Sequence, residues 1–215
     1  GQLDAAVRCY EKAFAINPDY AEAHNNLGVT LKELGQLDAA IKCYKNALAI
    51  NPDYAEVHNN LGVTLKELGQ LDEAVKCYEK ALTLKPDYTE AHNNLGNAFK
   101  ELDQPAAAVK FYEKALAINP DYAEAYYNLT IAYNKLGLSF KKLGRLDDAV
   151  KCYEKALAIN PDRTEAHNNI GIAYVYNGLG AAMHSLGQLD AAVKCYKNAL
   201  AIKPDYADAH ANRGN

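Results

Sequence analysis

Histidine and cysteine, two residue types that bind metals and act in catalysis, recur at fixed positions of this 215-residue sequence. The histidines share one position of a repeating unit and are His24, His58, His92, His167 and His210. A metal site needs ligands a few ångströms apart, typically two histidines at i and i+4 or a cluster of cysteines and histidines. One histidine per repeat does not converge in this way. We therefore interpret the row as packing residues and expect no metal and no cofactor.

The five cysteines also share one position, directly before a tyrosine, and are Cys9, Cys43, Cys77, Cys152 and Cys195. Residues one repeat apart in an array of helices lie roughly 10 Å apart, which is one helix-packing distance. A disulfide needs two Cα atoms within about 7 Å. We therefore expect reduced, half-buried packing residues, a state that fits a reducing compartment.

Acidic residues are abundant but dispersed. Asp72-Glu73 and Asp147-Asp148 lie at expected helix starts, where negative charge suits the helix dipole. General acid–base catalysis needs carboxylates that face each other across a cleft, which neighbours on one helix do not provide. The sequence contains no Gly-rich phosphate loop, nucleophile elbow or metal motif. We therefore expect no catalytic site in this chain and interpret it as a non-enzyme.

Asparagine forms the row with the clearest functional meaning. The row consists of Asn26, Asn60, Asn94, Asn128, Asn169 and Asn212. At 3.6 residues per turn, Asn26 shares a face with Glu22 and Glu33, away from the packing face. A carboxamide both donates and accepts hydrogen bonds, so such a row could hold the backbone of an extended polypeptide whatever its sequence. Alternatively, the asparagines bond only neighbouring helices or water, or persist through recent duplication.

A unit of 34 residues, Ala21–Tyr54, carries all these rows and recurs almost unchanged at Ala55–Tyr88. A short fixed period predicts a solenoid rather than a globule. We divide the single array over residues 1–215 into a half repeat (1–20), three regular repeats (21–54, 55–88 and 89–122), a repeat with seven extra residues (123–163), a repeat with nine extra residues (164–206) and the start of another (207–215).

Each repeat reads as two helices, which we name its first and second helix. In the copy 21–54, the first helix has an apolar face at i, i+3, i+7 and i+10, formed by His24, Leu27, Leu31 and Leu34. We expect Asp19 to cap this helix with Glu22, and Gly35 to end it in the left-handed conformation. The second helix is predicted over Asp38–Ile50.

Smaller departures from the unit concern turns and the terminal half repeat. In the copy 89–122, Asp103 replaces the turn glycine, and Pro105 suits the first position of a helix. The half repeat is expected to present an apolar helical face made of Ala5, Ala6, Tyr10, Ala13 and Phe14. The chain starts and stops within repeats, so we expect a piece of a longer protein.

The two longer repeats differ in what their extra residues do to the helix face. Adding seven residues to a helix brings the side chains back to within about 20° of their starting direction around the axis. The first helix of 123–163 can therefore be longer by about two turns and keep its apolar face. Its core face then reads Tyr126, Leu129, Tyr133, Leu136, Phe140 and Leu143. Nine residues turn the face by about 180°. We therefore predict a break or kink at 177–180, where the sequence reads NGLG.

The small, aromatic and proline positions of the unit resemble the tetratricopeptide repeat (TPR). The matching residues are Leu27, Gly28, Leu31, Gly35, Ala40, Tyr44, Ala47 and Pro52. The resemblance implies an all-α fold, a right-handed superhelix (α-solenoid) of antiparallel helix pairs, with the asparagine row on its concave groove. Repeats that read NNLG also resemble the arm of O-linked N-acetylglucosamine transferases and SPINDLY proteins, in which inner asparagines hold substrate polypeptide. The nine-residue insert departs from that pattern, and no glycosyltransferase domain is present.

Charge and hydropathy narrow the class of partner. The net charge is −4 and the pI about 5.9, which disfavours nucleic acid, although salt-dependent RNA affinity would revive that alternative. No apolar run suits a membrane span, and no signal peptide is recognisable. We expect a cytoplasmic or nucleocytoplasmic module that binds a protein or peptide in its groove. The alternative is a stand-alone scaffold for complex assembly or self-association as a homo-oligomer.

Overall fold

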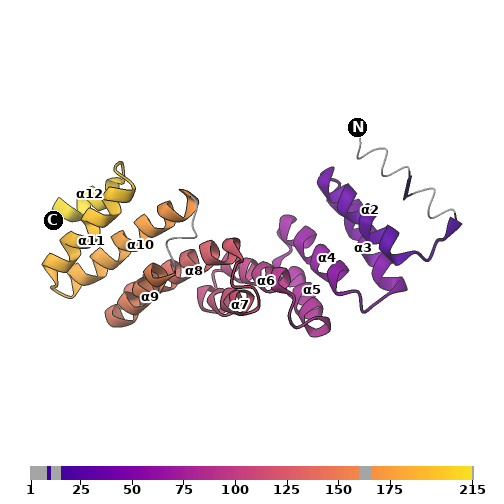
Figure 1. Ribbon diagram of the computed structural model, residues 1–215, viewed down its shortest axis with the longest axis horizontal. Helices are drawn as coiled ribbons and strands as arrows, with labels where there is room; N and C mark the ends of the chain where they lie inside the picture. The colour runs from indigo at the N-terminus through magenta and orange to yellow at the C-terminus, as the bar shows by residue number, and fades with distance from the viewer. Residues whose placement is uncertain (1–8, 11–15, 160–165, 215) are drawn as a thin grey trace. The chain divides into compact units, whose positions relative to one another are not determined.

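The computed structural model of the protein describes residues 9–10, 16–159 and 166–214, the side chains of 166–172 excepted. These ranges hold eleven α-helices and no strand, which confirms the all-α class (Figure 1). The predicted helix of the half repeat 1–20 lies largely outside the described residues. The helices are α2 (Ala21–Glu33), α3 (Leu37–Ile50), α4 (Ala55–Glu67), α5 (Leu71–Leu84), α6 (Thr89–Glu101), α7 (Pro105–Ile118), α8 (Ala123–Lys142), α9 (Leu146–Ala158), α10 (Ala166–Ser185), α11 (Leu189–Ile202) and α12 (Ala207–Gly214).

The chain forms two compact units, Gly1–Leu102 and Asp103–Asn215. In the first unit, each helix packs against the next, and the first helices α2, α4 and α6 also contact one another in turn. The second unit repeats this pattern, with α8, α10 and α12 as the contacting first helices. Each unit is thus a stack of antiparallel helix pairs in which the first helices form a continuous layer, as expected for an α-solenoid.

A tyrosine of the second helix and a glycine of the first helix hold each pair together. Tyr44 is fully buried, and a Cβ added to Gly28 would lie 2.5 Å from its Cε1 atom. The same contact joins Gly62 to Tyr78 and recurs in the second unit. Because a side chain at this glycine would overlap the ring, the two helices approach as closely as they do only with glycine there.

The turn between the helices of a pair follows the sequence prediction, but the helix start does not. Gly35 has a φ of 73°, and Asp103 takes the equivalent position with a φ of 55°. Pro105 is the first residue of α7, as predicted. The predicted Asp19 cap is wrong, because Tyr20 is the N-cap residue and no side chain caps α2. Asp19 lies one residue too early for its carboxylate to accept from the first turn.

The seven extra residues lengthen a first helix, as predicted. Helix α8 has 20 residues where α2, α4 and α6 have 13 each. Leu129 and Tyr133 are buried, and Leu136 and Phe140 are half-buried. Leu143 was predicted in the core face but is 72% exposed. It is the C-cap residue of α8 and lies beyond the last residue of the helix.

The predicted break in the second long repeat is wrong. Helix α10 runs without interruption through 177–180. Cβ atoms added to Gly178 and Gly180 would meet Tyr153 and Tyr196, respectively, each at less than 3 Å. Residues two apart lie on opposite sides of a helix, so α10 passes between α9 and α11 with a glycine toward each. A half-turn of the face is tolerated because both sides of this helix are packed.

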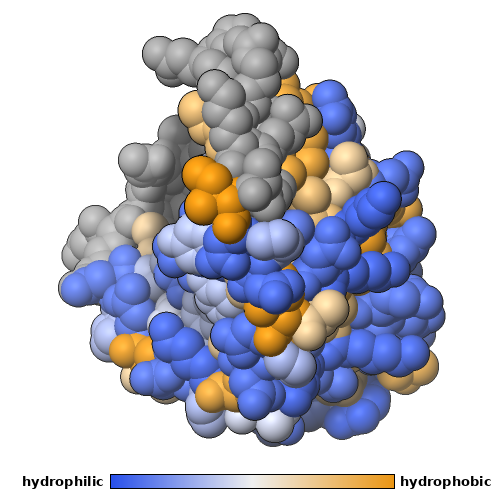
Figure 2. All heavy atoms as spheres, turned by 90° about the vertical axis from the view of Figure 1, so that its right-hand side faces the viewer, coloured by the Kyte–Doolittle hydropathy of each residue, from blue (hydrophilic) through white to orange (hydrophobic). Residues whose placement is uncertain are grey.

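The outer surface agrees with a solvated helical array. Figure 2 shows a face on which hydrophilic side chains predominate and hydrophobic ones appear in small, separate areas. In the regular first helix α2, Leu27 and Leu31 are buried as predicted, whereas His24 and Leu34 are only half-buried. Other residues of α2 are buried as well, Thr30 among them, so the buried surface of this helix extends beyond the predicted face.

Candidate functional site

The predicted asparagine row lies on the layer of first helices, and its members differ in burial. Asn26, Asn60, Asn94 and Asn212 are half-buried. Asn128 is only 4% exposed. The side chain of Asn169 lies outside the described residues. Four of the six predicted residues are therefore partly exposed to solvent.

Part of the row takes part in a ladder of hydrogen bonds between successive first helices. The Nδ2 group of Asn60 donates to Oδ1 of Asn25 over 3.1 Å, and the bond from Asn94 to Asn59 has the same length. In the second unit, Asn212 donates to Asn177 over 3.0 Å. The row thus makes bonds between neighbouring helices, whether or not it also binds a ligand. Each donor amide keeps its oxygen and its second N–H for another partner.

The acceptors of this ladder are residues that the sequence prediction missed. Asn25 and Asn59 precede the predicted row by one position and are buried. A buried carboxamide costs free energy unless it is hydrogen-bonded, and the next repeat supplies the donor. The signal in the sequence was the NN pair itself, because two adjacent asparagines on a helix project about 100° apart, one inward and one outward.

Charged and phenolic groups flank the row on the same layer. Glu22 and Glu124 are exposed and accept from Tyr20 and Tyr122, respectively, each over 3.3 Å. Near the other end of the first helices, ion pairs join successive repeats: Lys32 lies 3.5 Å from Glu67, and Lys66 lies 3.2 Å from Glu101. The amides of the row thus lie between exposed carboxylates and paired charges.

The histidine row has a defined structural role. The Nε2 atom of His58 lies 2.9 Å from the carbonyl oxygen of Pro52, six residues earlier, and the other described histidines of the row make the same contact. A carbonyl only accepts, so Nε2 carries the proton. Tyr126 occupies this position in one repeat, and its hydroxyl donates to Pro120 over 3.0 Å. The position therefore requires a donor of this reach, and no group of three or more potential ligands forms a metal site among the described residues.

The cysteines are free thiols, and Cys9 is exposed rather than half-buried as expected. Cys43, Cys152 and Cys195 are buried and Cys77 is half-buried. Burial raises the pKa of the first three thiols and raises that of Cys77 to about 11. The thiolate is the reactive form, so these side chains act as packing groups at neutral pH.

Comparison with known proteins identifies the family. A family model described as TPR repeat matches residues 1–35, 30–69 and 64–103. Models described as Tetratricopeptide repeat match 89–122 and 127–205. The chain is a tetratricopeptide-repeat protein. A search of the curated proteins finds no match.

Solved structures of several other proteins share the fold. The chain is 30% identical to the MamA protein, covering 87% of this chain and 93% of that one with a TM-score of 0.64. YrrB, a TPR protein with an unusual peptide-binding site, is 21% identical over 96% of this chain and 98% of its own, with a TM-score of 0.72. BtubC from P. vanneervenii is 22% identical, covering 94% and 89%, with a TM-score of 0.61. None of the described helices is long and apolar enough to cross a membrane.

Proposed function

We propose that this TPR chain is a protein-interaction module that binds an extended polypeptide, or a partner domain, in a concave groove lined by its first helices. The observation that carries the proposal is the repeated, half-buried amide of Asn26, Asn60, Asn94 and Asn212. A peptide backbone offers alternating donors and acceptors, and a carboxamide pairs with either. Affinity for the backbone would make recognition tolerant of sequence. The function proposed is binding, without catalysis by this chain.

Several observations support a polypeptide as the ligand. Exposed glutamates flank the row, so neutral or basic segments fit it better than acidic ones. YrrB, with the same fold, has a peptide-binding site.

The buried, protonated thiols suit a reducing compartment, in agreement with a cytoplasmic or nucleocytoplasmic location.

The test compares two double variants that break the same ladder bonds from opposite sides. Asn60→Ala/Asn94→Ala removes the amides proposed to face the ligand. Asn25→Ala/Asn59→Ala removes their buried acceptors and leaves the outward amides in place. Binding to an array of unrelated extended peptides is measured for both and for the parent chain, and circular dichroism checks folding. We expect the first variant to lose binding and the second to retain it.

Equal binding by all three proteins would make the row purely structural. The alternative, a stand-alone scaffold for complex assembly or self-association through other faces, would then explain the chain better. A dependence of apparent mass on concentration, measured by sedimentation, would support that alternative directly.

A narrower form of the proposal makes the chain the substrate-recruiting arm of a protein O-glycosyltransferase. Its support is the resemblance of the NNLG repeats and their asparagine row to that arm. The sequence of the full gene tests it. A glycosyltransferase domain in the same protein would agree with the narrower form, and a complete protein without one would exclude it.

A further inference from the structure

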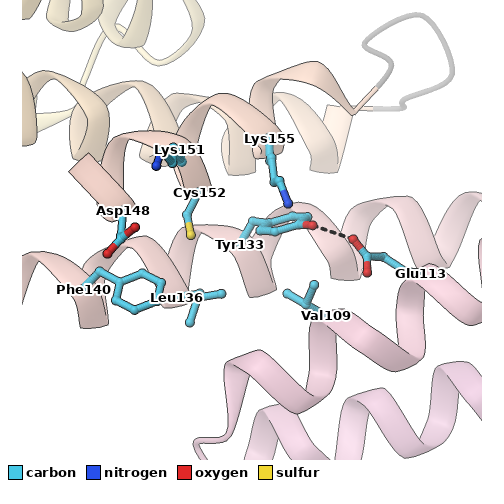
Figure 3. Close-up of a pocket in the computed structure, with 9 residues that line it drawn as sticks. All are labelled: Val109, Glu113, Tyr133, Leu136, Phe140, Asp148, Lys151, Cys152 and Lys155. Carbon is cyan, nitrogen blue, oxygen red and sulfur yellow. Dashed lines mark hydrogen bonds between the residues drawn. The ribbon is translucent and has the colours of Figure 1, made fainter. Parts of the chain in front are cut away.

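A hollow of about 310 Å³ lies beside the lengthened helix α8. Three helices line it (Figure 3): Val109 and Glu113 belong to α7, Tyr133, Leu136 and Phe140 to α8, and the remaining residues to α9. The seven extra residues of α8 move the start of α9 by about 10 Å along the helix axis relative to a regular repeat. The second helices α7 and α9 are therefore out of register with each other, and the inserted turn of α8 forms the floor between them.

The floor of this hollow is apolar. Val109, Tyr133 and Cys152 are buried, and Leu136 and Phe140 are half-buried. In Figure 3, the side chains of Leu136 and Val109 point into the space between the three helices. Arg145 covers one face of Phe140, with its guanidinium 4.4 Å from the ring centre. A volume of this size holds one or two large apolar side chains, at the lower end of the range for ligand pockets, about 300 to 1,000 Å³.

The rim of the hollow has a net formal charge of +1, from three cations (Arg145, Lys151 and Lys155) and two carboxylates (Glu113 and Asp148). The Asp148 carboxylate is neutralised by Arg145, whose nitrogen lies 2.6 Å away. Glu113 accepts a hydrogen bond of 2.5 Å from the hydroxyl of Tyr133. Lys151 and Lys155 are one helical turn apart on α9 and exposed, and no carboxylate of the described residues lies within ion-pair distance of either. The Lys155 ammonium lies 5.5 Å from the centre of the Tyr133 ring, above the apolar floor.

We propose that this hollow is a second binding site, which takes an acidic polypeptide segment with one or two large apolar side chains. The apolar side chains enter the space over Leu136, while flanking carboxylates pair with Lys151 and Lys155. This ligand is opposite in charge to the neutral or basic segments proposed for the asparagine row. The chain would therefore bind two different partner segments at two separate sites.

The test uses a fluorescein-labelled twelve-residue peptide with a central Leu-Phe pair flanked by aspartate and glutamate. Two matched peptides replace either the acidic flanks by lysine or the Leu-Phe pair by Ala-Ala. Binding to the whole chain is measured by fluorescence anisotropy at low and high ionic strength. We expect the acidic Leu-Phe peptide to bind at least about tenfold more tightly than either matched peptide, with an affinity that falls as salt is added.

Variants then locate the binding. Lys151→Glu/Lys155→Glu is expected to lower the affinity for the acidic Leu-Phe peptide by about tenfold or more. The matched control is Lys76→Glu/Lys80→Glu, which makes the same charge change at the equivalent positions of α5, next to a first helix of regular length. Leu136→Trp fills the hollow from its half-buried floor and is expected to weaken binding without a change of charge. Circular dichroism checks that each variant folds.

Three results would overturn the proposal. The first is equal binding of the acidic and basic peptides. The second is an equal loss in the α5 control and the α9 variant, which would show that only overall charge matters. The third is a loss of acidic-peptide binding in Asn60→Ala/Asn94→Ala, which would place the peptide on the asparagine row. Because that double variant tests the proposed function separately, failure of one site does not imply failure of the other.

Discussion

At the scale of single residues, the histidine position shows that a donor, rather than a particular ring, is what the fold requires. His58 and Tyr126 differ in size and chemistry, yet each donates to the proline carbonyl six residues earlier. That carbonyl lies in the loop between repeats, after the end of the preceding helix. The side chain thus ties the start of one repeat to the end of the previous one.

Replacement of His58 separates the donor from the ring. We expect His58→Phe to lower the free energy of unfolding by about 1 kcal/mol, because the Pro52 carbonyl loses its partner. His58→Tyr should leave it nearly unchanged, since tyrosine already makes this bond at position 126. Urea denaturation followed by circular dichroism measures both. Equal losses for Phe and Tyr would contradict the role assigned to the bond, and Tyr126→Phe provides the same test in the second unit.

Residue types predicted the packing but not the hydrogen bonds. Tyr44 and Gly28 matched the small and aromatic positions of the tetratricopeptide repeat, and the structure places one on the other. The partners of His58 and Asn60 depend on the path of a loop and on the approach of the next repeat. Those distances arise only when several elements are assembled, so one sequence period does not contain them.

At the scale of elements, a first helix of this fold can be lengthened by seven residues and keep its packing. Helix α8 keeps one apolar stripe over 20 residues, and its glycine still meets the tyrosine of the following helix. The angular argument predicted this growth correctly. The same argument failed for α10, because it assumed that only one side of a first helix is packed.

Deletion of residues 130–136 should return the repeat to regular length. The shortened sequence places Gly137 directly after Leu129, so the glycine that meets Tyr153 and the turn after it are both kept. We expect cooperative unfolding at the same urea concentration as the parent chain and a loss of acidic-peptide binding with the hollow. Deletion of residues 130–134 also keeps that glycine but turns the preceding face by about 140° and should lower stability clearly. Similar denaturation midpoints for the two deletions would contradict the role of the angle.

At the scale of the whole molecule, one buried tyrosine per helix pair couples stability to alkaline pH. Burial raises the pKa of Tyr44 and of Tyr153 to about 12, from about 10 in an unfolded chain. The folded state therefore keeps a proton that the unfolded state releases. The stability contributed by these groups is complete below pH about 10 and is lost as the pH rises toward about 12.

The alkaline loss should shrink when a buried tyrosine becomes phenylalanine. For each protein, the free energy of unfolding is compared between neutral pH and pH about 11. We expect the decrease to be about 1 kcal/mol smaller in Tyr153→Phe than in the parent chain. Urea denaturation at the two pH values measures the difference. Tyr20→Phe serves as the control, because its ring is exposed. A pH dependence that is the same in all three proteins would contradict the prediction.

The asparagine ladder also bears on how such an array changes over generations. Donor and acceptor are 35 residues apart in each described bond of the ladder, which between two regular repeats is one repeat plus one position. Unequal recombination between two near-identical copies adds or removes whole repeats and leaves that separation intact. Every new junction therefore receives its interhelical bond at once, without compensating mutation. The number of repeats can therefore change while the hydrogen bonds between successive first helices stay the same.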